Sequence, residues 1–356
     1  MPRAVIALSG GVDSAVAAVL LQDAGYDLVG VTMRLWPKSR CCDEKDIEDA
    51  AELCARLAIP YQVLDYRERF RAEIVDPFIA AYQAGRTPNP CTRCNQVLKF
   101  SALWQEAQRL GAEYLATGHY VRRILATEAQ IWRGVDGRKD QSYFLYAIER
   151  ELLPRLLFPL GDLRKEDVRA IAQARALPVA GKQESQDICF VAGDYRNFLH
   201  EQGVPERAGE IVDLQGKVLG THAGVINFTV GQRRGIGGGS SVPLYVVAVD
   251  ADRDQVRVGP AQHLLRDRLQ MRDCNWLGDW QPGQEARVAV QLRYAAPAVN
   301  ATLYLHAHAH AGATLHLDVA QRAVTPGQAA VCYQGERLLG GGIIVELGNA
   351  ADSASE

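Results

Sequence analysis

The sequence of 356 residues lacks any long apolar run. Its longest such run covers residues 15–21, whereas a membrane-spanning helix needs roughly 20 apolar residues. The apolar segment at residues 4–8 is too short for a signal peptide, and no cleavage pattern follows it. We therefore expect a cytoplasmic protein without a membrane partner.

Cysteine is scarce, and the sequence has no overall excess of positive charge. Eight cysteines are too few for a disulfide scaffold of this length, so each is a core residue, a metal ligand or a catalyst. The formal net charge is -3, which excludes an overall basic field of the kind that attracts nucleic acid. Residues 120–175 carry a local excess of Lys and Arg. The length suggests two or three domains.

The first half of the chain alternates between predicted strands and helices. Strands are predicted at residues 4–8, 27–35, 61–65 and 114–117, and helices at residues 13–24, 43–58, 68–83 and 95–110. This alternation indicates an α/β domain with a parallel sheet, which binds ligands beyond the carboxyl ends of its strands. Helices predicted at residues 141–157 and 163–176 extend this domain to about residue 195.

The second half contains short alternating segments that are typical of β structure. Hairpins are predicted for residues 210–222 and 244–258. Further strands are predicted at residues 286–292, 301–307, 329–333 and 342–347. These segments predict a small β-barrel or sandwich.

The strongest local motif follows the first predicted strand and precedes the first helix. It reads Ser9-Gly10-Gly11-Val12-Asp13-Ser14. Backbone N–H groups and the helix dipole converge at such a junction and bind an anion. The loop has no Walker-type lysine, so the hydroxyl groups and a metal ion near Asp13 must balance the phosphate charge. The motif predicts binding of a pyrophosphate group.

Two segments contain candidate reactive thiols. Cys91 and Cys94 form a CxxC that follows two prolines and precedes a predicted helix. The helix N-terminus and the neighbouring Arg93 both favour the thiolate of Cys94. A second CxxC, which a zinc ribbon requires, does not occur in the sequence. Cys189 lies in a polar segment, Lys182-Gln183-Glu184-Ser185-Gln186-Asp187-Ile188-Cys189.

The loop motif resembles that of the PP-loop ATP pyrophosphatases, which transfer adenylate from ATP to an acceptor oxygen. With the CxxC segment, the Cys189 segment, residues 116–120 (ATGHY), 139–143 (KDQSY) and 228–235 (FTVGQRRG), nearly the whole chain resembles the tRNA-specific 2-thiouridylases of the MnmA family. The resemblance implies an adenine nucleotide α-hydrolase-like PP-loop domain at residues 1–196. It also implies a small central β domain at residues 197–265, a C-terminal β-barrel at residues 266–348 and a frayed tail at residues 349–356.

The same resemblance implies ATP-dependent 2-thiolation of the wobble uridine in tRNAs for Lys, Glu and Gln. The implied catalytic residues are Asp13, which lies near Mg²⁺, Cys189, which carries a persulfide, and Cys94, the nucleophile that forms a disulfide with Cys189. The implied ATP-binding residues are Ala7, Leu8, Ser9, Gly10, Gly11, Val12, Asp13, Ser14, Met33 and Gly118. The implied contacts with tRNA and its target base are Asn89, Pro90, Cys91, His119, Lys139, Asp140, Gln141, Arg293, Tyr294 and Gln334. The implied sulfur donor is a cysteine desulfurase or a relay protein that presents a persulfide.

Three alternatives stay open at this point. Some members of the family have aspartate where this chain has Cys91, so Cys91, Cys94 and Cys189 could instead hold a [4Fe-4S] cluster that binds sulfide. A PP-loop adenylating amide synthetase would release pyrophosphate without needing Cys94 or Cys189. A non-catalytic nucleotide-binding module would bind ATP without releasing pyrophosphate.

Overall fold

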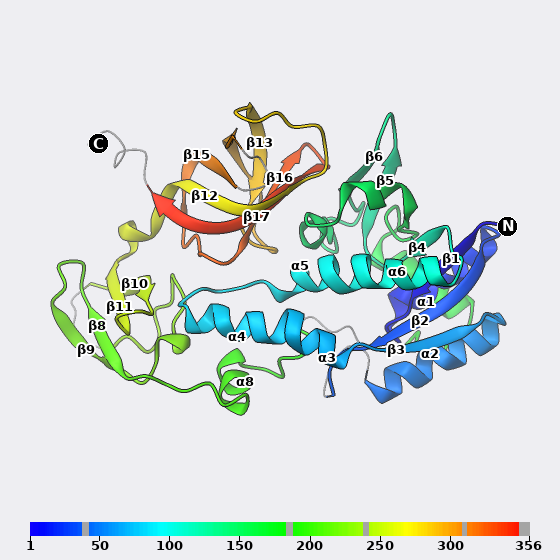
Figure 1. The fold of residues 1–356 in the computed structure, drawn as a ribbon, viewed down its shortest axis with the longest axis horizontal. Coiled ribbons are helices and arrows are strands. Elements are labelled where there is room, and N and C mark those ends of the chain that lie inside the picture. The colour runs from blue at the N-terminus through cyan, green and yellow to red at the C-terminus, as the bar shows by residue number, and fades with distance from the viewer. Residues whose placement is uncertain (38–42, 183–187, 238–241, 308–311, 349–356) are drawn as a thin grey trace. The chain divides into compact units, whose positions relative to one another are not determined.

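The computed structural model describes residues 1–37, 43–182, 188–237, 242–307 and 312–348 (Figure 1). The chain folds into two compact units. Unit 1 contains Met1–Val75, Pro90–Gly193 and Gly335–Leu338, and unit 2 contains Asp76–Asn89, Asp194–Gln334 and the chain from Leu339 onward. No helix among the described residues is both long enough and apolar enough to cross a membrane.

Unit 1 is built on a five-stranded parallel sheet in the order β3-β2-β1-β4-β7. The strands are β1 (Arg3–Ala7), β2 (Asp27–Arg34), β3 (Tyr61–Asp65), β4 (Tyr114–Ala116) and β7 (Leu156–Leu157). The central strand β1 is buried at Ala4, Val5 and Ile6, as expected for a strand covered on both faces. The parallel sheet confirms the predicted α/β architecture.

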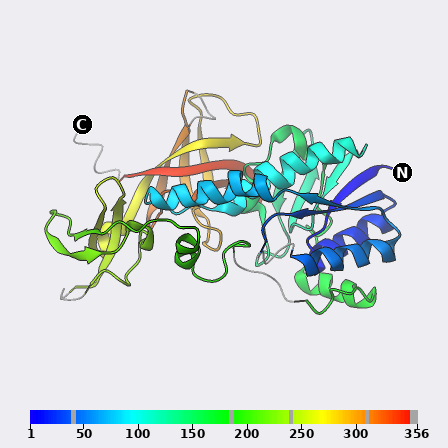
Figure 2. The same cartoon turned by 60° about the horizontal axis from the view of Figure 1, so that its bottom comes forward.

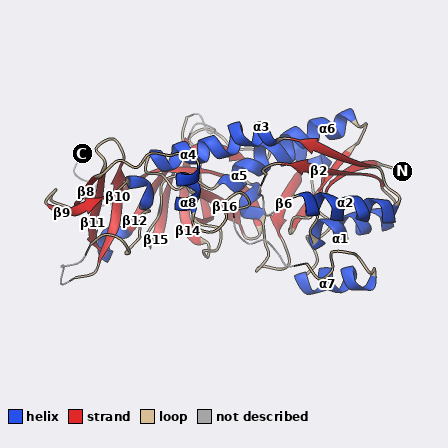
Figure 3. Cartoon of the chain, turned by 90° about the horizontal axis from the view of Figure 1, so that it is seen from below, coloured by secondary structure: helices blue, strands red, loops and turns tan. Residues whose placement is uncertain are grey.

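Helices cover both faces of this sheet. The α-helices of unit 1 are α1 (Val12–Asp23), α2 (Glu44–Leu57), α3 (Arg67–Phe70), α5 (Pro90–Cys94), α6 (Leu103–Arg109) and α7 (Lys165–Ala174). Two π-helical stretches, Arg71–Val75 and Asn95–Ala102, continue α3 and α5. Figures 2 and 3 show α6 on one face and α1 with α2 on the other, with α7 beyond α1. Helix α1 therefore lies between the sheet and α7.

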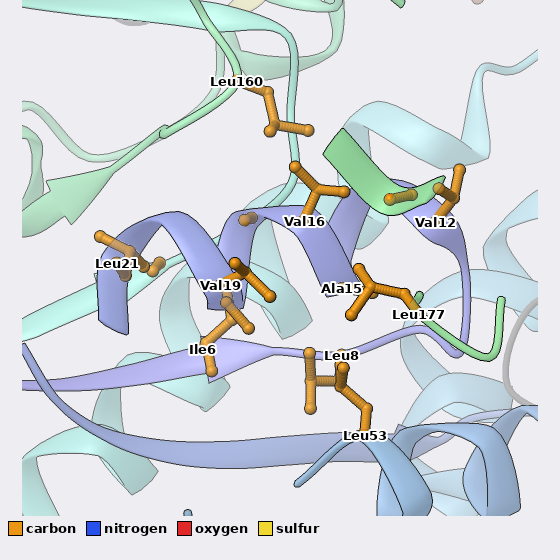
Figure 4. Close-up of a cluster of buried hydrophobic side chains, with 14 of the residues drawn as sticks. Ile6, Leu8, Val12, Ala15, Val16, Val19, Leu21, Leu53, Leu160 and Leu177 are labelled. Carbon is orange, nitrogen blue, oxygen red and sulfur yellow. The ribbon is translucent and has the colours of Figure 1, made fainter. Parts of the chain in front are cut away.

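The core of unit 1 forms around α1. Eight of the twelve residues of this helix are buried, because it packs against the sheet on one side and against α7 on the other. Figure 4 shows α1 between Ile6 and Leu8 of the first strand region and Leu160 on the opposite side. This packing fixes the first turn of α1, which is where the phosphate-loop motif lies.

Two predicted helices of unit 1 differ from the observed ones. The helix predicted from residue 95 begins at Pro90, because proline suits the first helical position, where its missing N–H is not needed. The helix predicted at residues 141–157 is wrong. That segment forms two 3₁₀ turns, Ser142–Leu145 and Arg150–Arg155, and the short strand β7. Pro154 lies in the second turn and prevents a continuous α-helix there.

Unit 1 also contains a hairpin that was not predicted. Strand β5 (Val121–Leu125) pairs antiparallel with β6 (Ala129–Arg133), and β6 pairs through Trp132 with Arg337, the first residue of β17 (Arg337–Gly348). Only four residues separate β4 from β5.

Unit 2 contains a four-stranded sheet and a closed barrel. The sheet has the order β10-β11-β8-β9, with β8 (Gly209–Val212), β9 (Val218–His222), β10 (Leu244–Asp250) and β11 (Gln255–Pro260), which confirms both predicted hairpins. The barrel has the order β12-β15-β14-β13-β16-β17, and β12 pairs with β17 to close it. Its strands are β12 (Leu265–Trp276), β13 (Glu285–Gln291), β14 (Val299–Leu305), β15 (Gly312–Arg322), β16 (Ala329–Gln334) and β17 (Arg337–Gly348). Two helices, α4 (Asp76–Gln83) and α8 (Tyr195–Glu201), complete unit 2.

Candidate functional site: a phosphate loop and two reactive-cysteine segments

The phosphate loop joins β1 to α1 and is held by its own hydroxyl groups. The side-chain oxygens of Ser9 and Ser14 lie 3.3 Å apart, and Ser14 also donates to the carbonyl oxygen of Gly11 at 3.1 Å. Gly10 has a φ of +65°, which favours glycine. Gly11 is the N-cap of α1, and no side chain caps the helix there. The first N–H groups of α1 therefore present a donor geometry that suits an anion.

Asp13 lies in the first turn of α1 and has two partners that the sequence did not reveal. Lys165 donates from Nζ to both carboxylate oxygens of Asp13, at 2.8 and 2.9 Å. The hydroxyl of Tyr120 donates to Oδ1 of the same carboxylate at 2.6 Å. The loop thus has a lysine beside it, contrary to the expectation that only hydroxyl groups and a metal ion balance its charge. Because Lys165 is 152 residues away from Asp13 in the chain, no local motif signals the pair.

Lys165 is held in place by the start of α7, of which it is the first residue. The backbone N–H of Lys165 donates to Oδ2 of the buried Asp136 at 3.1 Å. Val168 and Ala172 of α7 are buried in the same core as α1. The side chain of Lys165 is only 10% exposed, so its ammonium group has a fixed position beside the loop.

Most residues expected to bind ATP come together at the carboxyl ends of β1, β2 and β4. Ala7 ends β1, Leu8 and Val12 are buried beside it, and Met33 is buried in the neighbouring strand β2. Gly118 follows β4 and approaches α1 closely, since a Cβ at this position would lie 2.9 Å from the backbone nitrogen of Ser14. Glycine is therefore required at residue 118 to bring this strand end against the loop.

His119 follows Gly118 and is buried in an apolar setting. Its Nδ1 lies 2.8 Å from the hydroxyl oxygen of Thr117, and its ring packs against those of Phe100 and Phe158. Burial, together with the positive charge of Lys99, holds the pKa of His119 well below its ordinary value of 6.5. His119 is therefore a neutral side chain at physiological pH.

Asp140 and Gln141, both expected to contact tRNA, make hydrogen bonds within unit 1. The buried carboxylate of Asp140 accepts from Arg133 at 2.7 Å, from the hydroxyl of Ser142 at 2.8 Å and from two backbone N–H groups at 3.1 Å. Oε1 of Gln141 accepts from the backbone N–H of Tyr120 at 2.9 Å. Lys139 is half-buried. In this structure Asp140 and Gln141 thus stabilise the chain around Tyr120, which in turn contacts Asp13.

The CxxC segment lies in a helix rather than before one. Cys91 is the second residue of α5 and is half-buried, whereas Cys94 is the fifth residue and is 7% exposed. Cys94 is thus one turn inside the helix, and Cys91 is nearer to the positive end of the helix dipole. The Nε of Arg93 donates to the carbonyl oxygen of Glu73 at 2.9 Å, so this side chain connects α5 to the preceding π-helical stretch.

Cys189 is half-buried, and the residue after it is anchored in an aromatic cluster. The ring of Phe190 packs edge-to-face against Phe70 at 5.5 Å and against Trp36 at 6.4 Å between ring centroids. Trp36 lies just beyond β2, and Phe70 ends α3. The cluster therefore holds the backbone next to Cys189, while the thiol keeps partial access to solvent. Residues 183–187 of the Cys189 segment lie outside the described residues.

The remaining residues expected to contact tRNA are divided between the two units. Pro90, which begins α5, is buried in unit 1, and Asn89 is a half-buried residue of unit 2. Arg293, Tyr294 and Gln334 are exposed residues of unit 2, the first two after β13 and the third at the end of β16.

The described residues show no grouping of side chains that is typical of a metal centre. Across the described ranges, no three side chains of His, Cys, Asp or Glu are grouped so that they could hold a metal ion. Asp13 is thus a single carboxylate at the phosphate loop.

Three family models match the chain in succession. The tRNA methyl transferase HUP domain matches residues 2–193, the tRNA methyl transferase PRC-barrel domain matches residues 196–260, and the aminomethyltransferase beta-barrel domain matches residues 266–344. The first of these models alone covers more than half of the chain.

Curated relatives match almost the full length. A tRNA-specific 2-thiouridylase MnmA of Acidithiobacillus ferrooxidans is 60% identical over 96% of this chain and 98% of the relative. Proteins of the same name from Magnetococcus marinus and Moorella thermoacetica are each 46% identical over 96% of this chain and at least 98% of the relative. A solved 4-thiouridine synthetase–RNA complex with bound ATP is 17% identical, with a TM-score of 0.37 over 56% of this chain and 50% of that chain, too low a likeness to support a conclusion. The identity and coverage of the curated relatives show that this chain belongs to the family of tRNA-specific 2-thiouridylases, MnmA, and is an enzyme of tRNA modification.

Proposed function

We propose that this enzyme replaces the C2 oxygen of the wobble uridine in tRNA with sulfur, and that it uses ATP to activate that oxygen. The observation that carries the proposal is the uncapped N-terminus of α1, where the phosphate loop meets the Asp13–Lys165 pair at the carboxyl ends of the parallel strands. A parallel sheet binds its ligand at this edge, and the N–H groups of the loop suit a polyphosphate. The acceptors are tRNAs for Lys, Glu and Gln, and the reaction takes place in the cytoplasm.

In the first step, the uracil O2 attacks the α-phosphorus of ATP, forming an O2-adenylate and releasing pyrophosphate. The loop N–H groups hold the pyrophosphate portion, and the Lys165 ammonium balances its negative charge. Met33 and Gly118 lie beside the loop at the ends of β2 and β4, where they contact the adenosine. Adenylation converts a poor leaving group into AMP.

The site fits a magnesium ion that is bound mainly by the phosphates. Mg²⁺ is commonly held by one or two carboxylates together with substrate phosphates, and Asp13 supplies one carboxylate that is 31% exposed. Asp13 would hold the ion together with the phosphates of ATP, and the ion would supply positive charge that offsets the phosphate charge. The two hydrogen bonds from Lys165 keep the Asp13 carboxylate oriented toward the phosphate site.

In the second step, sulfur passes from a persulfide on Cys189 to the base. The terminal sulfur attacks C2 and AMP leaves, so that the base is linked to Cys189 through a disulfide bond. The Cys94 thiolate then attacks Sγ of Cys189, which forms a Cys94–Cys189 disulfide and releases the 2-thiouracil as a thiolate. A thiol reductant regenerates both cysteines, and a cysteine desulfurase or relay protein reloads Cys189.

Asn89, Pro90 and Cys91 lie next to Cys94 in the chain, and we assign them to contacts with the target base. Lys139, Arg293, Tyr294 and Gln334 are assigned to the tRNA surface, together with His119, Asp140 and Gln141, which shape the chain around Tyr120. Cys91, Cys94 and Cys189 are also the residues that the [4Fe-4S] alternative would use, and we derive no step through that cluster, because the described residues contain no group of metal ligands. The mechanism is therefore derived through the persulfide alone.

The decisive experiment is a thiolation assay with unmodified tRNA, ATP, magnesium and a persulfide donor. We expect 2-thiouridine to form with the wild-type enzyme and to be lost in both Cys94→Ser and Cys189→Ser. Both variants should still release pyrophosphate, because adenylation precedes sulfur transfer. Cys274→Ser is the matched control, since Cys274 is buried in the barrel of unit 2. If either single variant thiolates tRNA at the wild-type rate, the assigned roles of Cys94 and Cys189 are wrong.

A further inference from the structure

One short segment of unit 1 contacts both residues that donate to Asp13. We call residues 134–142, which follow β6 and reach the first 3₁₀ turn, the strap. Of the two donors to the Asp13 carboxylate, Lys165 begins α7 and Tyr120 lies between β4 and β5. The strap holds each of these donors through a different residue.

Asp136 is the strap residue that holds Lys165. Its side chain is only 4% exposed, and Oδ2 accepts from the backbone N–H of Lys165 at 3.1 Å. The N-cap residue of α7 is Arg164, whose guanidinium cannot accept a hydrogen bond, so the first N–H of the helix donates to Asp136 instead. Oδ1 of Asp136 accepts from the backbone N–H of Arg138 at 3.1 Å, which fixes the carboxylate within the strap. Asp136 thus caps α7 from outside the helix and sets the position of its first residue.

The carboxylate of Asp136 keeps its charge in this setting. Burial acts to raise the pKa of Asp136, but the hydrogen bonds from the backbone N–H groups of Lys165 and Arg138 outweigh burial and lower the pKa. A negative charge at the start of α7 also faces the positive end of the helix dipole, which stabilises the charge. The cap on α7 is therefore present at neutral pH.

Gln141 is the strap residue that holds Tyr120. Oε1 of Gln141 accepts from the backbone N–H of Tyr120 at 2.9 Å, and the backbone N–H of Gln141 donates to the carbonyl oxygen of Tyr120 at 3.2 Å. These two hydrogen bonds fix the backbone from which the Tyr120 side chain extends. The hydroxyl of that side chain donates to Oδ1 of Asp13 at 2.6 Å.

The strap is held in one shape by Asp140. The buried carboxylate of Asp140 accepts from the backbone N–H groups of Gly134 and Ser142, the two ends of the strap, both at 3.1 Å. A carboxylate makes stronger hydrogen bonds than a neutral acceptor does. Because both ends of the strap are bound to one carboxylate, Asp136 and Gln141 are kept at a fixed separation.

We propose that the strap positions the carboxylate of the phosphate site, with Asp136 and Gln141 as its positioning residues. This inference rests on the proposed function, in which Asp13 and Lys165 act on the phosphates of ATP. In this role neither positioning residue contacts the nucleotide, since the first acts through Lys165 and the second through Tyr120. Both donors are thereby held on one carboxylate, which keeps that carboxylate in a single orientation for the phosphates.

The test measures ATP affinity by calorimetry with magnesium and without tRNA, so that contacts of the strap with tRNA play no part. We expect Asp136→Ala to raise the Kd for ATP about fivefold, since the loss of the cap releases the Lys165 ammonium from its position. Asp136→Asn keeps one acceptor and should give a smaller increase in the same direction. The control is Asp162→Ala, which removes an exposed carboxylate just before α7 and should match the wild type.

A double-variant cycle shows whether the effect of Asp136 passes through Lys165. In a Lys165→Met background, Asp136→Ala should change the Kd for ATP by less than about twofold. A merely structural role would raise the Kd by the same factor in both backgrounds, because independent changes add in free energy.

The second positioning residue is tested in the same way. Gln141→Leu should raise the Kd for ATP about threefold, and this increase should be lost in a Tyr120→Phe background, which lacks the hydroxyl. Gln141→Glu retains the acceptor and should raise the Kd less than Gln141→Leu does.

The position of Lys165 can also be followed without nucleotide. The folded protein is treated with a limiting amount of acetic anhydride, and mass spectrometry compares acetylation of Lys165 with that of the exposed Lys45. We expect this ratio to rise at least about threefold in Asp136→Ala, because an ammonium that is 10% exposed becomes accessible when the start of α7 is released. The ratio should not change in Asp162→Ala. Denaturant unfolding checks that each variant is folded, and Asp136→Asn carries the same measurements if Asp136→Ala does not fold.

Three results would overturn the inference. They are a wild-type Kd for ATP in folded Asp136→Ala, an unchanged acetylation ratio in that variant, and an equal factor of increase in the Kd with and without Lys165. The last result would show that Asp136 acts independently of this donor. A wild-type enzyme that does not bind ATP would instead contradict the proposed function, so the two failures are distinguishable.

Discussion

The ion pair between Lys165 and Asp13 gives a prediction that can be worked out from the structure. Lys165→Met removes an ammonium that is 10% exposed and leaves a carboxylate that is 31% exposed. Removing one partner of a fully buried pair costs about 3–5 kcal/mol. Solvent contact and the remaining hydrogen bond from Tyr120 reduce this for Asp13, so we expect a loss of about 2 kcal/mol in the free energy of unfolding.

Substitution of the acidic partner should lower the free energy of unfolding further. Asp13→Asn leaves the ammonium of Lys165 in its shielded position, and we expect a loss of about 3 kcal/mol. The double variant, Lys165→Met with Asp13→Asn, has neither charge, so no unpaired charge remains at the site. The sum of the two single losses in the free energy of unfolding should therefore exceed the loss in the double variant by at least about 1 kcal/mol. A double-mutant cycle measured by denaturant unfolding checks this.

Lys165→Met should also weaken nucleotide binding. If the Lys165 ammonium balances phosphate charge, its loss removes a charged contact of about 2 kcal/mol, which corresponds to roughly a thirtyfold higher Kd for ATP. Calorimetry on Lys165→Met checks this, and the exposed Lys45→Met serves as the control. Additive unfolding energies would show that the two side chains do not interact. An unchanged Kd for ATP would refute the assigned charge role of Lys165.

Three further predictions follow from burial and close contacts. Because the pKa of His119 is held below 6.5 in the folded chain, the unfolded chain binds more protons below that pH, so stability should fall as the pH decreases below about 6.5. His119→Gln should flatten this dependence in denaturant unfolding, whereas His316→Gln, at an exposed position, should not. Gly118→Ala should raise the Kd for ATP and lower stability by about 1–3 kcal/mol, because its Cβ meets the backbone of α1 at 2.9 Å; equal binding in a calorimetric titration would contradict this. Burial raises the pKa of Cys54 to about 12, so iodoacetamide at pH 8 should label Cys189 and spare Cys54. Mass spectrometry of the native protein after labelling checks this, and comparable labelling of both residues would show that Cys54 is accessible as a thiolate.

The sequence alone determined the features that depend on neighbouring residues. The sequence pattern located β1, β2, β3 and β4, and for β1, β2 and β4 the reason is that a buried parallel strand is a short apolar run between helices. The glycines and hydroxyl groups of the phosphate loop were evident, since they act within six consecutive residues. The succession of motifs also identified the family. The start of α5 was misplaced, because prolines mark either a loop or the first turn of a helix and local sequence does not distinguish the two.

Only the tertiary structure decided which distant side chains complete the site. Lys165 and Lys182 reach the phosphate loop from 152 and 172 residues away in the chain, so no spacing rule could reveal them. The carboxylate of Asp140 accepts hydrogen bonds from residues up to seven positions away and stabilises its own loop, and only the structure shows these contacts. The physical reason is that charge pairing depends on distance in space. The packing of α7 on α1, which no single segment encodes, sets the distance between Lys165 and Asp13.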